Sequence, residues 1–205
     1  MKKKLIFDMG GVLIHWDPGR IVKRLGLEDE DAALLLREVF HEVEWPSLDR
    51  GSMSEEQAIS AIRARLPERL HEAVDRCVYW WRDPLWPMEG MEALLRELKA
   101  LGHPIYLLSN ATSALHEYFP RIPGSDCFTG GLVSADHRLL KPQHEIYELL
   151  FETFSLRPED CLFIDDAPYN IEGAARVGLH GIVFQGDMQE LRRRLREKGI
   201  PVDSE

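Results

Sequence analysis

The chain has 205 residues, of which 44% are hydrophobic and 29% charged, a composition typical of a soluble globule with one sizeable core and a small accessory domain. Its formal net charge of −10 argues against a nucleic-acid partner, because phosphate backbones would be repelled. The one basic run, residues 192–196, is expected to form a solvated face near the carboxyl end of the last helix.

The three cysteines, Cys77, Cys127 and Cys161, are odd in number and lack CxxC spacing. This pattern predicts neither a disulfide framework nor a zinc site, and it suits a reducing cytoplasm. No segment approaches the ~20 consecutive apolar residues of a membrane-spanning helix. We therefore expect a cytoplasmic protein without a membrane partner.

Strand and helix patterns alternate at the start of the chain and through its second half. The first apolar strand ends at Asp8, which Gly10 and Gly11 follow. Later strand-like segments are 105–109, 161–165 and 182–184, with helical patterns at 89–100, 144–154, 170–177 and from 187 onward. This order predicts an α/β fold, a Rossmann-like open parallel sheet with helices on both faces.

The segment between the first two strands has a different pattern. It contains helical runs at 19–25, 30–43, 55–66 and 68–81 and no convincing strand. Ser54 and Gln57 form a capping-box pattern, preceded by an expected turn at 49–52. We expect a small all-helical cap domain at 18–85, inserted into a core domain of 1–17 and 86–205 that ends in a loose tail from Gly199.

Polar residues follow the predicted strands in a specific order. Asp8 comes first, then Ser109-Asn110, Lys141-Pro142 and Asp165-Asp166. This order resembles the haloacid dehalogenase-like (HAD) superfamily of hydrolases, in the branch with a helical cap between the first two motifs. Residues 7–14 and Trp16-Asp17-Pro18 look closest to HAD phosphatases in which the usual aspartate two positions after the nucleophile is glycine, similar to the sugar-1-phosphate phosphatases. The resemblance implies a Mg²⁺-dependent phosphomonoesterase that acts on a small phosphorylated metabolite through an aspartyl-phosphate intermediate.

Each motif has a role under this resemblance. Asp8 would attack phosphorus, Ser109 and the Asn110 backbone N–H would bind phosphoryl oxygens, and Lys141 would bridge the phosphoryl group and Asp8. The expected Mg²⁺ ligands are Asp8, the Gly10 carbonyl, Asp165 and Asp166, because a hard cation prefers oxygen ligands. Asn170 is expected to orient the acidic loop from behind, or alternatively to cap a helix.

The chain departs from the family at Gly10. Many HAD phosphatases have an aspartate there that protonates the leaving oxygen and later activates water. The substrate could have a good leaving group, such as the anomeric oxygen of a sugar phosphate, or His15 could be the acid. The third alternative is a slow enzyme or a non-hydrolytic module that accepts or binds phosphate. A haloacid dehalogenase is less favoured, because that chemistry does not need the paired carboxylates Asp165-Asp166.

The predicted cap is rich in aromatic and polar side chains, namely His41, Glu44, Trp45, Asp49, Arg50, Trp80, Trp81 and Arg82. Of these, Trp45 and Arg50 are our candidates for substrate binding. Such side chains suit a hydroxylated substrate and favour a sugar phosphate. The tryptophans could equally form the core of the insertion or a dimer contact, so both a monomer and a homodimer remain open.

Overall fold

The computed structural model describes residues 2–203 and contains one five-stranded parallel sheet. Its spatial order is β3-β2-β1-β4-β5. The strands are β1 (Lys4–Phe7), β2 (Ile105–Ser109), β3 (Gly130–Val133), β4 (Cys161–Asp165) and β5 (Gly181–Val183). The structure therefore confirms the predicted Rossmann-like open sheet.

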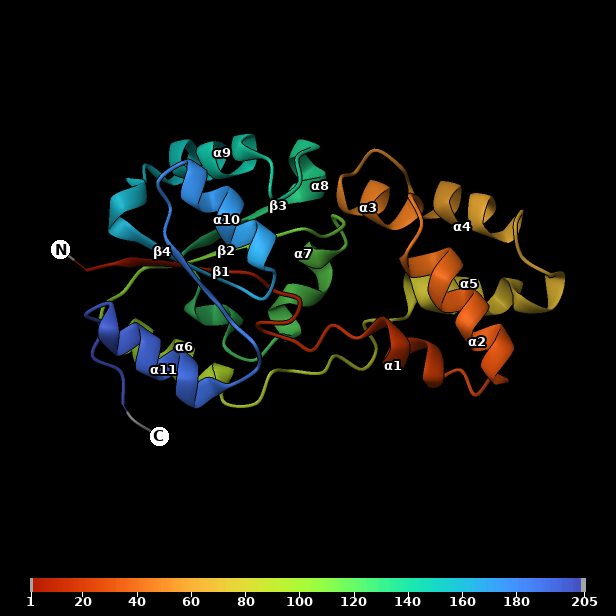
Figure 1. The fold of residues 1–205 in the computed structure, drawn as a ribbon, viewed down its shortest axis with the longest axis horizontal. Helices are drawn as coiled ribbons and strands as arrows, with labels where there is room; N and C mark the ends of the chain where they lie inside the picture. The colour runs from red at the N-terminus through yellow and green to blue at the C-terminus, as the bar shows by residue number, and fades with distance from the viewer. Residues whose placement is uncertain (1, 204–205) are drawn as a thin grey trace.

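Helices cover both faces of this sheet (Figure 1). The core helices are α6 (Met91–Ala100), α7 (Leu115–Tyr118), α8 (Ser134–His137), α9 (His144–Phe154), α10 (Pro168–Arg176) and α11 (Met188–Glu197). Leu5 and Phe7 of β1 join the cluster packed under α6 and α11, whereas Ile6 joins the cluster under α9 and α10. This alternation buries the central strand on both faces, as expected for a parallel sheet.

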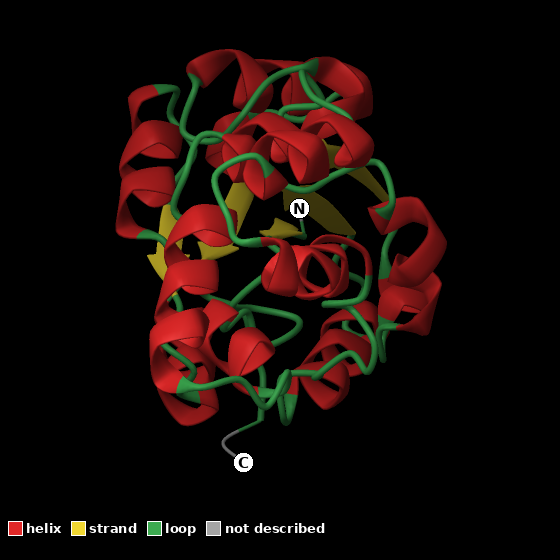
Figure 2. Ribbon diagram, turned by 90° about the vertical axis from the view of Figure 1, so that its right-hand side faces the viewer, coloured by secondary structure: helices red, strands yellow, loops and turns green. Residues whose placement is uncertain are grey.

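Five further helices form a separate group between β1 and β2, which we call the cap helices. They are α1 (Pro18–Lys23), α2 (Asp29–Leu35), α3 (Glu44–Asp49), α4 (Glu55–Arg63) and α5 (His71–Tyr79), and a π-helical turn (Leu36–Phe40) continues α2. They pack around their own apolar cluster, which includes Leu35, Ile62 and Val74. Figure 2, seen from their side, shows the strands behind them. The expected capping box at Ser54 is present.

The chain enters and leaves the cap helices through two neighbouring segments. The His15 N–H donates to the carbonyl of Trp86 at 2.7 Å, and the Met88 N–H donates to the carbonyl of Leu13 at 2.8 Å. Ile14 forms an isolated antiparallel bridge to Pro87. The two connections are thus bonded to each other before they reach the sheet.

Strand register brings the first and last acidic motifs together. Phe7 of β1 pairs with Leu107 of β2 on one side and with Ile164 of β4 on the other. Asp8 follows Phe7 and Asp165 follows Ile164, so the two aspartates lie at the same carboxyl edge of the sheet. Ligands of open parallel sheets bind at this edge.

Three expectations need correction. Helix α3 occupies a segment where no helix was predicted, because six residues that include Pro46 show no helical period. The tail from Gly199 is not loose, since Ile200 and Val202 are buried in the core, although residues 204–205 lie outside the described part of the chain. The basic run is not entirely solvated, since Arg192 is buried and bonds to Glu97.

The described residues 2–203 include no helix that is both long and apolar enough to cross a membrane. Cys77, Cys127 and Cys161 are buried and free. None of these three cysteines is therefore paired with another in the described part of the chain.

Candidate active site

A cavity of about 240 Å³ lies between the carboxyl edge of the sheet and the cap helices. The core contributes polar groups to its wall, namely Asp8, Asn110, Lys141, Asp166 and Asn170. The cap helices and the segments beside them contribute Trp16, Trp45, Leu48, Asp49, Glu55, Val78 and Trp81. The cavity therefore has a charged floor and an upper wall that combines three tryptophans with two aliphatic and two acidic side chains.

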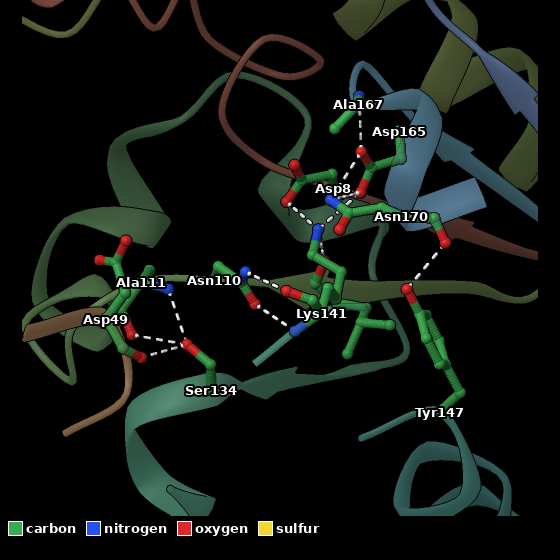
Figure 3. A network of polar contacts seen from close by, with 11 residues as sticks. Asp8, Asp49, Asn110, Ala111, Ser134, Lys141, Tyr147, Asp165, Ala167 and Asn170 are labelled. Carbon is green, nitrogen blue, oxygen red and sulfur yellow. Dashed lines mark hydrogen bonds and ion pairs between the residues drawn. The ribbon is translucent and has the colours of Figure 1, made fainter. Parts of the chain in front are cut away.

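Lys141 is at the centre of the floor (Figure 3). Its Nζ lies 2.8 Å from Oδ1 of Asp8 and 2.7 Å from Oδ2 of Asp165, and it donates to the carbonyl of Leu108 at 3.0 Å. Lys141 is only 3% exposed and Asp165 is fully buried. One buried cation thus joins the carboxylates that follow β1 and end β4.

Burial and charge shift the pKa values of this pair. Burial raises the pKa of Asp8 to about 7; Lys141 opposes this shift, and the nearby carboxylates Asp165 and Asp166 add to it. Burial alone would lower the pKa of Lys141, but the charges of Asp8 and Asp165 hold it above the ordinary value. Lys141 therefore remains charged and favours the ionised, nucleophilic form of Asp8.

The carboxylate of Asp165 is held by several hydrogen bonds to the residues around it. Its Oδ1 accepts from the Ala167 N–H at 2.8 Å, and the Asn170 side-chain amide donates to both carboxylate oxygens, at 3.0 and 3.1 Å. The Tyr147 hydroxyl in turn donates to the Asn170 carbonyl at 2.8 Å. With Lys141 on Oδ2, both oxygens of Asp165 are engaged, so this residue is less available to a metal than was expected.

The acidic cluster fits a divalent cation. Asp8, Asp165 and Asp166 can each present one oxygen, and these atoms lie within 4.8 Å of one another. Asp166 is exposed, in contrast to Asp165. Gly11 makes room for it: a Cβ at Gly11 would lie 2.2 Å from Oδ2 of Asp166, and its φ of +72° favours glycine.

The Ser109-Asn110 pair ends β2 at the same edge. The Ser109 hydroxyl is buried and makes no hydrogen bond to any described residue. The Asn110 side chain instead supports the lysine, since its Oδ1 accepts from the Lys141 N–H at 2.8 Å and its Nδ2 donates to the Lys141 carbonyl at 3.0 Å. Asn110 lines the cavity, whereas Ser109 does not.

Four predicted site residues do not line this cavity. Ser109 and Asp165 adjoin or bond to residues of its polar floor, whereas His15 and Arg50 lie apart from that floor. His15 is exposed and lines a separate surface depression with Trp86 and Pro87. Arg50 is exposed and does not contribute to the wall, because the chain turns after α3 and directs the preceding residue inward instead. We therefore assign no role to His15 or Arg50, while Trp45 does line the cavity.

Asp49 is a cavity residue that the sequence analysis listed among the polar side chains of the cap and placed in a turn, but did not choose as a site residue. It ends α3 and is partly buried. Tyr118 of α7 also lines the cavity and is buried. The signal that could have identified Asp49 was a carboxylate directly ahead of the Arg50-Gly51 turn that leads into the capping box.

Comparisons with known proteins agree with this architecture. A profile of the haloacid dehalogenase-like hydrolases matches residues 3–178. The sesquiterpene phosphatase astK of Aspergillus oryzae is 28% identical over 183 residues, or 88% of both chains. Flavin mononucleotide hydrolase 1 of Arabidopsis thaliana is 25% identical over 167 residues, which cover 82% of this chain and 66% of that protein.

The fold also matches solved structures. A HAD family enzyme from Bacteroides thetaiotaomicron, in complex with magnesium and inorganic phosphate, superposes with a TM-score of 0.71. The match covers 93% of this chain and 99% of that chain at 21% identity, a level that establishes a shared fold. Because the family profile spans most of the chain and the motifs meet at one edge, the protein belongs to the haloacid dehalogenase-like hydrolase family.

Proposed function

We propose that this hydrolase is a Mg²⁺-dependent phosphomonoesterase that cleaves a small phosphorylated metabolite through an aspartyl phosphate on Asp8. The observation that carries the proposal is the pairing of Lys141 with the buried Asp8 at 2.8 Å, beside the exposed carboxylate of Asp166. The nucleophile, a cation for the phosphoryl oxygens and candidate metal ligands thus meet at one cavity.

The metal would be held by Asp8, Asp166 and the Gly10 carbonyl, with Asp165 orienting Lys141 beside them. When bound, Mg²⁺ would draw charge from the phosphoryl oxygens and screen them from the attacking carboxylate. Ser109 would then donate its unpartnered hydroxyl to a phosphoryl oxygen, together with the Asn110 backbone N–H. Asn170 keeps the carboxylate of Asp165 in place.

The cavity favours a small substrate. Its volume of about 240 Å³ is below the roughly 300–1,000 Å³ of pockets that enclose drug-sized ligands. A sugar phosphate remains our first candidate, and the cap helices, which we keep as a domain at 18–85 over a core of 1–17 and 86–205, would close over it. We also propose that the protein is located in the cytoplasm and is a monomer or a homodimer.

A second substrate class is favoured by the tryptophans of the upper wall. Trp16 packs against Trp45 and Trp81 at ring-centroid distances of 5.3 and 4.8 Å, and all three line the cavity. Such a surface suits the phosphate of an apolar alcohol, and the astK relative is named as a sesquiterpene phosphatase. The rings also belong to the apolar cluster of the cap helices, so their packing alone does not select this class.

The test is phosphate release from a panel of sugar 1- and 6-phosphates, flavin mononucleotide, prenyl monophosphates and simple alkyl phosphates. We expect turnover that needs Mg²⁺, stops with EDTA, and falls to background in Asp8→Asn. A 2-chloropropionate arm covers the dehalogenase alternative, in which chloride release would not need Mg²⁺. A phosphoaspartate that forms on Asp8 without phosphate release would instead indicate a phospho-accepting module.

A further inference from the structure

The core side of the cavity offers only poor proton donors to the proposed reaction. Burial raises the pKa of Tyr118 and of Tyr169, the Thr112 hydroxyl is a weaker acid still, and Asp166 is a proposed metal ligand. Gly10 has no side chain, and Lys141 is held between two carboxylates. In phosphoryl transfer the attacking and leaving oxygens are roughly in line through phosphorus. With Asp8 on the floor, the leaving oxygen must point away from the sheet, toward the cap helices.

Two carboxylates from the cap helices line the cavity, Asp49 and Glu55. Glu55 has a cationic partner, since Arg82 Nη1 lies 3.8 Å from its Oε1. The carboxylate of Asp49 makes no ion pair or hydrogen bond with any residue in 2–203. Asp49 is therefore the acidic group of the upper wall that is free to contact a substrate.

The backbone fixes Asp49 against the core rather than leaving it on a loose loop. The Ser134 hydroxyl donates to the Asp49 carbonyl at 2.5 Å and accepts from the Ala111 N–H at 2.9 Å (Figure 3). Two residues later, Gly51 lies so close to α8 that a Cβ would sit 2.3 Å from the carbonyl oxygen of Ala135. The end of α3 is thus docked on the segments that follow β2 and β3.

The surroundings of Asp49 favour its neutral form. Burial raises its pKa to about 8, the negative charge of Asp8 adds to this shift, and Lys141 opposes it. A neutral carboxyl group can donate a proton and does not repel a phosphate dianion. The ordinary aspartate pKa, near 3.8, would leave an anion at neutral pH.

We propose that Asp49 acts as the general acid and then the general base of the reaction, a role that Gly10 cannot fill because it has no side chain. The grounds are the position of Asp49 in the cavity wall, its lack of a partner and its docking on the core. This inference rests on the proposed phosphatase function. In the first step an Asp8 oxygen bonds to phosphorus, the bond from phosphorus to the leaving oxygen breaks, and that oxygen takes the proton of Asp49. In the second step the Asp49 carboxylate takes a proton from water as the water oxygen attacks the phosphoaspartate. The bond from phosphorus to the Asp8 oxygen then breaks and restores the carboxylate.

The test compares leaving groups. An alkyl phosphate needs protonation of its leaving oxygen, whereas p-nitrophenyl phosphate leaves as a stable anion. In Asp49→Asn we expect alkyl phosphate turnover to fall by roughly 10²–10⁴-fold, the usual contribution of general acid catalysis. With p-nitrophenyl phosphate the same variant should release a burst of about one nitrophenolate per active site and then stall as phosphoaspartate, detectable by mass spectrometry. Asp29→Asn, at an exposed aspartate of α2 outside the cavity, is the matched control and should behave as wild type.

A rescue variant distinguishes loss of a proton donor from misfolding. A Cβ at Gly10 would have its nearest contact at 3.4 Å, on Trp16, so Gly10→Asp fits the backbone. In the Asp49→Asn background it should restore alkyl phosphate turnover by about ten-fold or more.

Three results would overturn the inference: alkyl phosphate turnover by Asp49→Asn close to wild type, an equal loss on both substrates without a burst, or no rescue by Gly10→Asp. If the wild type itself shows no turnover that depends on Asp8 and Mg²⁺, the proposed function fails first, and this outcome is separate from the three above.

Discussion

At the scale of single residues, the site concentrates carboxylates around one cation. Lys141 compensates Asp8 and Asp165, and Asn170 fills the remaining acceptor positions of Asp165. The side chains that follow the strands could be predicted from the sequence, because parallel strands end at one edge. Asp49 could not, since its approach to Asp8 depends on how the cap helices dock and not on any local pattern.

The shifted pKa of Asp49 predicts a cost in stability. The folded-state pKa is about 8 against an ordinary 3.8, so the fold resists ionisation of this carboxyl group. Relative to Asp49→Asn, the wild type should lose stability as pH rises from about 4 to about 8, by up to about 6 kcal/mol at about 1.4 kcal/mol per pKa unit. Below pH 4 the two proteins should be equally stable.

Urea unfolding at pH 5, 7 and 9 in EDTA would measure this difference. Asp126→Asn is a control of opposite sign, because Arg96 lowers the pKa of Asp126 and the native state favours its ionised form. A difference between Asp49→Asn and the wild type that does not change with pH would contradict the predicted shift.

At the scale of elements, strands and long helices agreed well with the sequence. Helix α9 was predicted at its observed bounds, because eleven residues give a clear helical period. The short helices α3, α7 and α8 were not predicted, since their four to six residues show no helical period. One of these helices, α3, carries Asp49. The sequence therefore missed this helix and its site residue for the same reason.

The docking of α3 on α8 gives a prediction for this contact. In Gly51→Ala the new Cβ would meet the Ala135 carbonyl, which must push the end of α3 away from the core. We expect alkyl phosphate kcat/KM to fall by about ten-fold or more as the proton donor moves off the leaving oxygen.

Gly26→Ala is the matched control for backbone strain. Gly26 has a φ of +67°, close to the +70° of Gly51, but nothing lies within 4 Å of its added Cβ. Both variants should therefore lose about 1 kcal/mol of stability to backbone strain, and Gly51→Ala should lose more because of its clash with Ala135. Only Gly51→Ala should lose activity. Equal kcat/KM values for the two variants would show that the contact does not position the site.

At the scale of the whole molecule, the chain closes its core with its last described residues. Ile200 is fully buried in the cluster formed by β1, α6 and α11. The sequence suggested a loose tail because the last residues of a domain are often poorly ordered. Only the tertiary packing shows that the segment after α11 completes the lower layer of the fold.

Ile200→Ala should therefore destabilise the protein by roughly 2–5 kcal/mol, as is usual when a buried isoleucine is truncated. The midpoint of urea unfolding would fall without a change in slope. Lys198→Ala, at an exposed position two residues earlier, should change the free energy of unfolding by less than about 0.5 kcal/mol. Equal midpoints for the two variants would contradict the burial of the tail.

The paired connections at Leu13–Met88 and His15–Trp86 have a consequence for how such an enzyme can diversify. The cap helices leave and rejoin the core at one bonded crossing, so the whole insertion can be exchanged without altering the order of the strands. With the proton donor in that insertion, an exchange would replace the binding surface and the acid together. Substrate choice and leaving-group chemistry would then be inherited as one unit, whereas the nucleophile and its lysine would stay with the sheet.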